Sequence, residues 1–322
     1  MENLTLIKKF KNAKFIQFSP NGDYIVAVSR NQIIVIDANS LNEITVYNGL
    51  KDPGMIAFAV HDGKVFASKS AYKKLTLIEL GDDLKAKSYR VTTSDEPQDF
   101  NIHFSPDDKK IITGIYNIYN NTISLLDLET SKIENVKVYE NAFVNKIQYS
   151  DVDDIFLFSV FEREGRIIDG EVYSITTLLK WKYPFDTHEP IRMTTELIVA
   201  WDDISYNQET KKFALYDSRE KTLIITDYTL KNECLRYNVT DRRSGYFSRL
   251  NWSLDGKYIV LTFLNSVKII NAQNAKCIKE LKVSSGLYSE FSSDGNLLLI
   301  GTYKVGYLID VSDLPYLQSG CT

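Results

Sequence analysis

A short turn that recurs along the chain constrains its fold more than any other feature. The stretch Phe18-Ser19-Pro20-Asn21-Gly22 ends one apolar segment and leads into the next, at residues 24–28. Clear copies begin at Phe104, Trp252 and Phe291, for example Trp252-Ser253-Leu254-Asp255-Gly256. Weaker copies begin at three further aromatic residues, Phe58, Tyr149 and Tyr206. The chain is therefore built from seven related units, and we call the aromatic residue that opens each copy its landmark aromatic.

The spacing of these residues predicts the architecture. Successive landmark aromatics lie 40, 46, 45, 57, 46 and 39 residues apart. Each interval holds four short apolar segments between turn signals, as at 14–18, 24–29, 32–37 and 43–47. A period of about 40–45 residues with four strands is typical of a β-propeller. We expect an all-β, seven-bladed β-propeller of four-stranded antiparallel blades, forming one domain over residues 1–322.

The fourth unit is the least regular. Its strands are predicted at 145–149, 155–161, 168–174 and 178–183, and an insertion at 184–196 accounts for the interval of 57 residues.

The last blade lacks a good fourth strand, because Pro315 and a polar tail follow its third. Residues 4–10 align with residues 277–283, since both begin fourteen residues before a landmark aromatic. We therefore expect the N-terminal strand to complete the last blade.

The turns and the acidic ends of several third strands, among them Ile36-Asp37 and Ile309-Asp310, resemble those of WD-repeat propellers over essentially the whole chain. The chain departs from that family because no Trp precedes these acids and no Gly-His pair precedes a blade. The resemblance implies a diverged WD-like propeller. Such folds commonly act as protein-binding scaffolds.

Composition excludes some classes of partner. The net charge of −4 and the dispersed Lys and Arg residues disfavour nucleic acid, which requires clustered cations. We also expect no membrane association and a cytoplasmic location, because no export signal or membrane-length apolar segment is visible. The three cysteines have no paired short spacing, and we expect all of them to be free.

Strand alternation assigns faces to the innermost strands. The residue two positions before each landmark aromatic is nearly always aliphatic and should pack between blades. The residues one and three positions before it should face a central channel. At the third position lie Lys146, Asp203 and Arg249 in consecutive blades, and Tyr288 follows in the last blade. The simplest interpretation is a water-filled channel in which the three charges neutralise one another.

Loops on one face supply the remaining candidates. Tyr and Arg are enriched in interaction hot spots, and Arg offers a fork of donors for carboxylate or phosphate. The candidate binding residues at the channel mouth and loop face are Lys146, Asp203, Arg249, Arg163, Arg166, Arg242, Arg243, Tyr246, Phe247 and Tyr288.

The favoured function is a non-enzymatic scaffold that binds a protein partner through the loop face. The alternative is a lactonase-like or sialidase-like enzyme, or a binder of a small anion, acting at the channel mouth. No catalytic residue, metal site or cofactor is predicted, because histidines and carboxylates do not cluster at the required spacing.

Overall fold

The computed structural model describes residues 4–11, 13, 15–29, 31–48, 50, 53–59, 65–70, 74–80, 85–90, 102–116, 120–140, 142–150, 154–168, 171–185, 190–193, 203–217, 219–239 and 244–314. The chain divides into two compact units. The first unit comprises Met1–Ser29, Ile34–Ile44 and Thr195–Thr322, and the second comprises Arg30–Ile33 and Thr45–Thr194. The described residues contain no α-helix, and so none that could cross a membrane.

The strands form seven four-stranded antiparallel sheets, as expected from the repeats. In chain order they are β1 (Thr5–Lys11); β2 (Phe15–Phe18), β3 (Tyr24–Val28), β4 (Gln32–Asp37), β5 (Glu43–Asn48); β6 (Pro53–Phe58), β7 (Val65–Ser70), β8 (Lys74–Glu79), β9 (Lys85–Arg90); β10 (Ile102–Phe104), β11 (Lys110–Tyr116), β12 (Asn120–Asp127), β13 (Ile133–Glu140); β14 (Ala142–Ser150), β15 (Ile155–Ile168), β16 (Glu171–Lys182), β17 (Ile191–Met193); β18 (Asp203–Asn207), β19 (Lys212–Asp217), β20 (Thr222–Asp227), β21 (Glu233–Asn238); β22 (Phe247–Trp252), β23 (Tyr258–Phe263), β24 (Ser266–Asn271), β25 (Lys276–Lys282); β26 (Gly286–Phe291), β27 (Leu297–Thr302) and β28 (Val305–Asp310).

Burial falls from the middle strands of a sheet to its last strand. Every residue of β23 is buried, and β20 is buried up to its final residue. By contrast, β21 alternates between exposed and half-buried side chains. Both faces of the middle strands are covered, so these segments are continuous apolar runs. The last strand has one solvated face and alternates.

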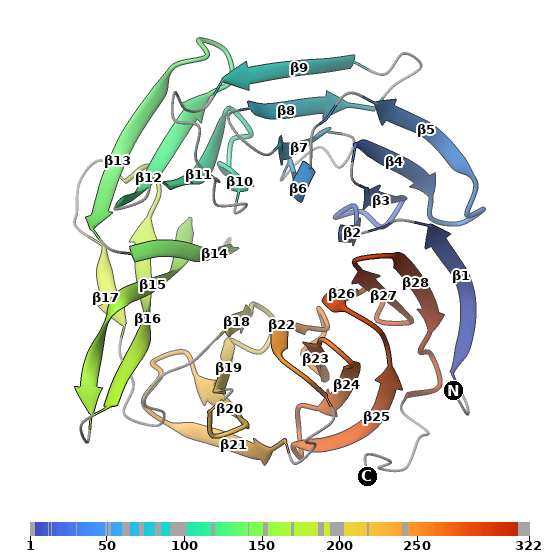
Figure 1. Ribbon diagram of the computed structural model, residues 1–322, viewed down its shortest axis with the longest axis vertical. Coiled ribbons are helices and arrows are strands. Elements are labelled where there is room, and N and C mark those ends of the chain that lie inside the picture. The colour runs from blue at the N-terminus through green and yellow to red at the C-terminus, as the bar shows by residue number, and fades with distance from the viewer. Residues whose placement is uncertain are drawn as a thin grey trace. The chain divides into compact units, whose positions relative to one another are not determined.

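The N-terminal strand β1 completes the last sheet, as the sequence predicted. It pairs antiparallel with β28, from Thr5 opposite Asp310 to Lys11 opposite Val305, and the two strands run side by side (Figure 1). Leu4 and Phe10, at its two ends, are buried in apolar clusters of the first unit. Burial of these side chains anchors the strand at both ends.

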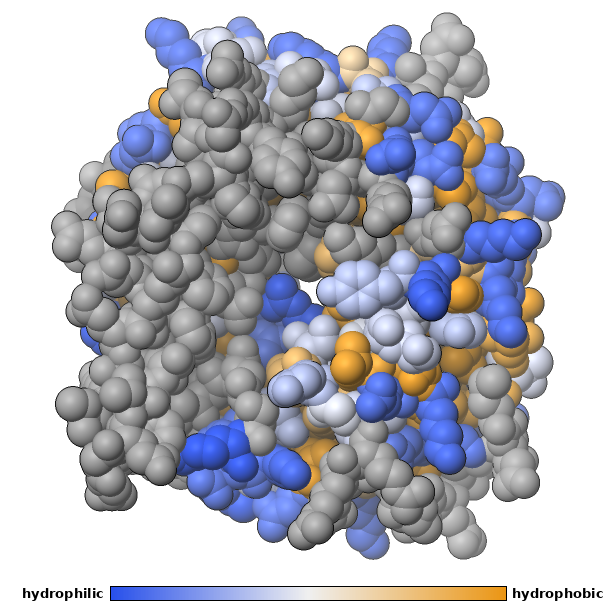
Figure 2. Space-filling view, in the orientation of Figure 1, coloured by the Kyte–Doolittle hydropathy of each residue, from blue (hydrophilic) through white to orange (hydrophobic). Residues whose placement is uncertain are grey.

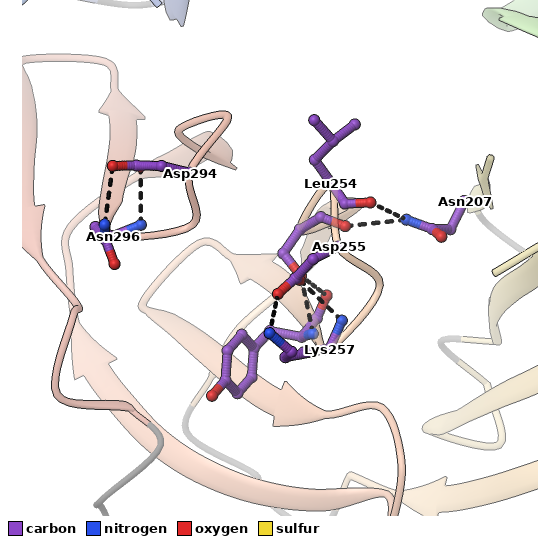
Figure 3. A network of polar contacts seen from close by, with 8 residues as sticks. Asn207, Leu254, Asp255, Lys257, Asp294 and Asn296 are labelled. Carbon is purple, nitrogen blue, oxygen red and sulfur yellow. Dashed lines mark hydrogen bonds and ion pairs between the residues drawn. The ribbon is translucent and has the colours of Figure 1, made fainter. Parts of the chain in front are cut away.

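A repeated hydrogen-bond pattern closes the turn between the first and second strands of a sheet. In the turn after β22, the Ser253 hydroxyl donates to the Asp255 carboxylate over 2.7 Å and accepts the Tyr258 N–H over 2.9 Å. The Asp255 carboxylate also accepts the Lys257 N–H. Figure 3 shows this turn beside its counterpart after β26, where Asp294 binds Asn296.

The same arrangement recurs in both units. Ser19 and Ser105 replace Ser253 after β2 and β10, and each accepts the N–H five residues later. Ser hydroxyls and Asp or Asn side chains favour turns because they satisfy local backbone donors in this way. This local chemistry explains why the motif survives while the rest of the sequence varies.

The fourth sheet differs from the sequence prediction. β15 and β16 form one long hairpin, and the last strand is the short β17, inside the segment predicted to be an insertion. The predicted third and fourth strands at 168–174 and 178–183 are therefore wrong, because residues 171–182 are a single strand. The apolar run from Leu178 to Trp181 is buried, as middle strands are. β17, in contrast, is mostly exposed, as the last strand β21 is.

Candidate functional site

The innermost strands of the first unit bring several candidate residues together. β18, β22, β26 and β2 contact one another in that order. The side chains two positions before each landmark aromatic are fully or almost fully buried here, as alternation predicted. They are Ile204, Leu250, Ser289 and Ile16. This column forms the packing between sheets, and the polar side chains lie on the alternate positions.

Asp203 is a buried carboxylate that joins two sheets. Its side chain is 1% exposed and accepts the N–H of Ile204 over 2.9 Å and that of Leu250, in β22, over 3.0 Å. Arg249 lies beside it, with Nη1 4.0 Å from the Asp203 carboxylate. The innermost strand of a sheet has an unpaired edge, and a buried N–H on that edge requires an acceptor. Asp203 supplies that acceptor for β22.

A second carboxylate performs the same task between β26 and β2. Glu290 accepts the N–H of Phe18 and the hydroxyl proton of Tyr288, each over 2.5 Å. The Gln17 amide donates to the Tyr288 hydroxyl over 3.3 Å. Burial raises the pKa of Glu290 to about 7, and these hydrogen bonds oppose that rise. Burial, with the nearby Glu290 carboxylate, also raises the pKa of Tyr288 well above its usual value.

Glu290 is the site residue that the sequence prediction omitted. It occupies the position one before the landmark aromatic, where other sheets have Gln17, Ser205 or Asn251. A neutral side chain at this position can also bind a neighbouring sheet, since the Asn251 amide donates to the Ser289 carbonyl over 2.7 Å. We call such a contact between the innermost strands of two sheets a joint. The signal available in the sequence was a carboxylate at a position where these other sheets have neutral polar side chains.

A β-bulge precedes the candidate position in three sheets. The strand register shifts just before Lys146 in β14, Arg249 in β22 and Tyr288 in β26. In the first unit the two bulges are joined, because the Ser248 hydroxyl donates to the Leu287 carbonyl over 2.8 Å. Bulges re-aim side chains at strand ends and are recurrent features near functional sites. Because each bulge lies just before the candidate residue, the alternation of strand faces still holds between that residue and the landmark aromatic.

Exposed tyrosines mark the loop ends of β22 and β27 in the first unit. Tyr246 is 85% exposed and Tyr303 is 59% exposed. Both are held by backbone hydrogen bonds between loops, since the Tyr246 carbonyl accepts the Leu264 N–H and the Tyr303 N–H donates to the Ser285 carbonyl. These loops are thus fixed platforms for exposed aromatic rings.

Phe247 supports this surface from beneath. Its ring lies 4.2 Å from that of Tyr216 and 5.6 Å from that of Phe263, centroid to centroid. Phe247 is half-buried and begins β22, whereas its neighbour Tyr246 points outward. The sequence predicted that both residues lie on the loop face. In the structure Tyr246 is exposed, whereas Phe247 is half-buried.

The structure does not test whether the other candidate residues lie near Asp203 and Arg249. Lys146 lies in β14 of the second unit and is half-buried. Arg163 and Arg166 were predicted in a loop, but their backbone belongs to the extended strand β15, and their side chains lie outside the described part. Arg242 and Arg243 lie outside the described residues altogether. Neutralisation of Lys146 by Asp203 remains a prediction.

Cysteine chemistry differs from expectation at one position. Cys234 is free and exposed, as predicted. Cys277 is disulfide-bonded, so the expectation of three free cysteines is wrong. Cys321 lies outside the described residues. Within the described residues, no group of histidine, cysteine and carboxylate side chains could hold a metal ion.

The visible surface of the described residues is mixed in character. In Figure 2, hydrophobic atoms occur in small patches among hydrophilic ones. Scattered apolar atoms are normal for a protein surface. A binding surface must therefore be identified from particular side chains.

Comparison with known proteins supports the fold alone. No protein-family model matches the chain, and no curated protein sequence matches it. Among solved structures, the chain is similar to the β-propeller domain of Cps50 (Swd1) from Myceliophteria thermophila, with a TM-score of 0.74 and 11% sequence identity. The match covers 96% of this chain and 99% of that one. This chain has the fold of a seven-bladed β-propeller, as the turns and their spacing predicted.

Proposed function

We propose that this protein is a non-enzymatic scaffold that binds a protein partner through the loop ends of its first unit. The exposed side chains of Tyr246 and Tyr303, held on hydrogen-bonded loops, are the observation that supports this proposal. Tyrosine gives a large contact area at low cost in conformational entropy, and it is enriched in interaction hot spots. Loops that are already ordered lose little further freedom on binding.

The charge near these tyrosines suggests the character of the partner. Lys304 is exposed next to Tyr303, and the loop after β19 carries Arg219 and Lys221, also exposed. Glu220 is the only exposed carboxylate in that short loop, and Arg219 pairs with it over 3.1 Å. Arg219 also lies 3.8 Å from the buried Asp217 carboxylate, so the surplus positive charge comes from Lys221 and Lys304. This surface is locally positive in a chain of net charge −4. A partner with carboxylates around an apolar centre would complement it.

The anion-binding alternative has weaker support. Arg249 is a described cation at a predicted channel position, but the Asp203 carboxylate lies 4.0 Å from it. An arginine that is already paired has less of its charge available for a ligand. We therefore place the partner at the loop ends, and we also propose a cytoplasmic location.

The test compares two exposed surfaces of the same unit. Tagged wild-type protein and the Tyr246→Ala, Tyr303→Ala double variant are used to capture partners, which are quantified by mass spectrometry. The matched control is Leu254→Ala, because Leu254 is 63% exposed but lies in the turn at the opposite end of β22.

We expect the tyrosine variant to bind its specific partner about thirtyfold more weakly, the equivalent of one hot spot, and the Leu254 variant to retain it. Raising the salt concentration should weaken capture by the wild type. Retention by the tyrosine variant, or loss in the control alone, would contradict the proposal.

A further inference from the structure

A cleft lies between two neighbouring sheets of the first unit, at the ends of the strands opposite the loop surface. Its volume is about 470 Å³. This is within the usual range for sites that bind small molecules. It is lined by Thr210, Lys212, Cys234, Leu235, Trp252, Asp255, Gly256, Lys257, Ala272 and Gln273.

One side of the cleft is apolar and fixed in place. Trp252 and Leu235 pack against the core cluster that contains Ala272. The indole N–H of Trp252 donates to the Ser205 carbonyl over 3.0 Å, which fixes the plane of the ring across the joint between the sheets. A fixed indole face favours a flat apolar ligand, since both surfaces are rigid and stack without loss of rotamer freedom.

The other side of the cleft carries positive charge. Lys257 pairs with Asp255 over 2.8 Å. Lys212 is half-buried, and within the part of the chain that the structure describes no ion pair joins it to a carboxylate. The lining thus has two ammonium groups and one carboxylate, which leaves one positive charge. A ligand with a single negative charge would balance it.

Close packing between the sheets preforms this shape. The Asn207 amide donates to the carbonyls of Ser253 and Leu254, over 3.0 and 3.2 Å, as Figure 3 shows for Leu254. Gly256 approaches so closely that an added Cβ would lie 2.3 Å from the Thr210 methyl carbon. The walls of the cleft therefore cannot slide freely past each other.

We propose that this cleft binds a small monocarboxylic acid with a flat apolar body. The carboxylate would meet Lys212, and the apolar body would lie against Trp252 and Leu235. This cleft is distinct from the loop ends that carry Tyr246 and Tyr303. Failure of one proposal would therefore leave the other untouched.

Cys234 provides a direct reporter because its free, exposed thiol lines the cleft. The intact protein is treated with N-ethylmaleimide in the presence of benzoate, phenylacetate or indole-3-acetate. The rate of Cys234 labelling is followed by peptide mass mapping, which separates it from the other cysteines. The corresponding primary amides serve as neutral controls of the same shape.

The acids should slow labelling of Cys234 at concentrations on the order of 1 mM, the usual affinity of fragments of this size. The amides should protect much less. Lys212→Gln should raise the half-protecting concentration of the acids about tenfold, the loss expected for one charge-assisted hydrogen bond. Lys276→Gln should leave it unchanged, because Lys276 is exposed but does not line the cleft.

Three results would overturn the proposal. These are no protection by any of the acids, equal protection by acids and amides, or protection that survives Lys212→Gln. Thermal unfolding of each variant verifies that the fold is intact. Because the chain has three tryptophans, the part of the fluorescence quenching that Trp252→Phe removes gives an independent measure of occupancy.

Discussion

The two ends of the innermost strands differ in how much their residues vary from sheet to sheet. At the turn end, Ser253, Ser292 and Ser105 make the same hydrogen bonds in three different sheets, from both units. At the loop end, the equivalent positions in consecutive sheets are Asp203, Arg249 and Tyr288. The turn end repeats one solution to a local folding problem. The loop end differs from sheet to sheet, and this is where a scaffold can be specific for a partner.

The contrast also separates two sources of stability. Turn hydrogen bonds are local, and each should contribute a modest amount. The contacts between sheets rest on buried groups that differ from one pair of sheets to the next, such as Asp203 and Glu290. Substitutions should therefore have similar effects across the turns and unequal effects across the joints.

The largest effect is expected at the joint formed by Asp203. Asp203→Ala leaves the buried Leu250 N–H without this acceptor and removes the carboxylate that lies 4.0 Å from Arg249. We expect a loss of about 3 kcal/mol in the free energy of unfolding. Asp203→Asn retains an acceptor oxygen and should cost only about 1 kcal/mol. Urea denaturation measures both, and equal losses would show that the buried hydrogen bond is unimportant.

Gly256 tests whether the turns are equivalent in their surroundings. It has a φ of +67°, and a Cβ would lie 2.3 Å from Thr210 Cγ2. Gly256→Ala should cost about 2 to 3 kcal/mol, from strain and overpacking together. The matched control is Gly295→Ala, which has a φ of +74° but nothing within 4 Å, and it should cost about 1 kcal/mol. Equal costs in thermal unfolding would mean that only backbone conformation matters.

Glu290 should make the joint between β26 and β2 sensitive to pH. Its pKa rises from 4.5 to about 7 in the folded protein. The native state then binds more protons than the unfolded state between these values, so stability is fully present below pH 4.5 and is lost as the pH rises through 7.

We expect the wild type to lose on the order of 2 kcal/mol between pH 5 and pH 8 relative to Glu290→Gln, which cannot ionise. Urea denaturation at both pH values measures this difference. Identical pH dependence in the two proteins would contradict it.

The serines of the turns should behave alike. Ser253→Ala removes the acceptor for the Tyr258 N–H and should cost about 1 kcal/mol, and Ser105→Ala in the second unit should cost the same. Both side chains are fully buried. A difference above about 1 kcal/mol in chemical denaturation would show that the surroundings outweigh the shared hydrogen bonds.

The smallest effect is expected at Tyr246. Because its side chain is 85% exposed, Tyr246→Ala should change the free energy of unfolding by less than about 0.5 kcal/mol. The same substitution should impair partner capture, so it separates a role of Tyr246 in binding from a role in stability. A large loss of stability in thermal unfolding would assign Tyr246 a structural role instead.

Most of the fold could be predicted because the turns carry a local signal. Asn21-Gly22 and Asp255-Gly256 mark strand ends, and their period gives the number of sheets. The fourth sheet was mispredicted because apolar residues at 178–181 were assigned to a last strand. The last strands β17 and β21 are largely solvated, whereas a run that is mostly apolar, such as 178–181, fits a middle strand that is covered on both faces.

Less of the site could be predicted. Alternation identified Asp203 and Arg249 as side chains on one face, and the structure brings them together. It could not reveal that Asp203 accepts the N–H of Leu250, because that hydrogen bond depends on how two sheets dock. The disulfide of Cys277 shows the same limit, since the spacing of the three cysteines in the sequence did not reveal it.

The pairing of β1 with β28 has a consequence for the order of events during synthesis. β1 is synthesised before the strands of the six other sheets and its partner β28 after them, so the edge of β1 that pairs with β28 stays unpaired during that time. During this time β1 carries a positive charge from Lys8, Lys9 and Lys11. This charge disfavours non-native pairing with the edge of another strand. Completion of the last sheet then requires contact between opposite ends of the chain, and contacts of such large sequence separation form slowly. The first of the described strands is thus among the last to pair.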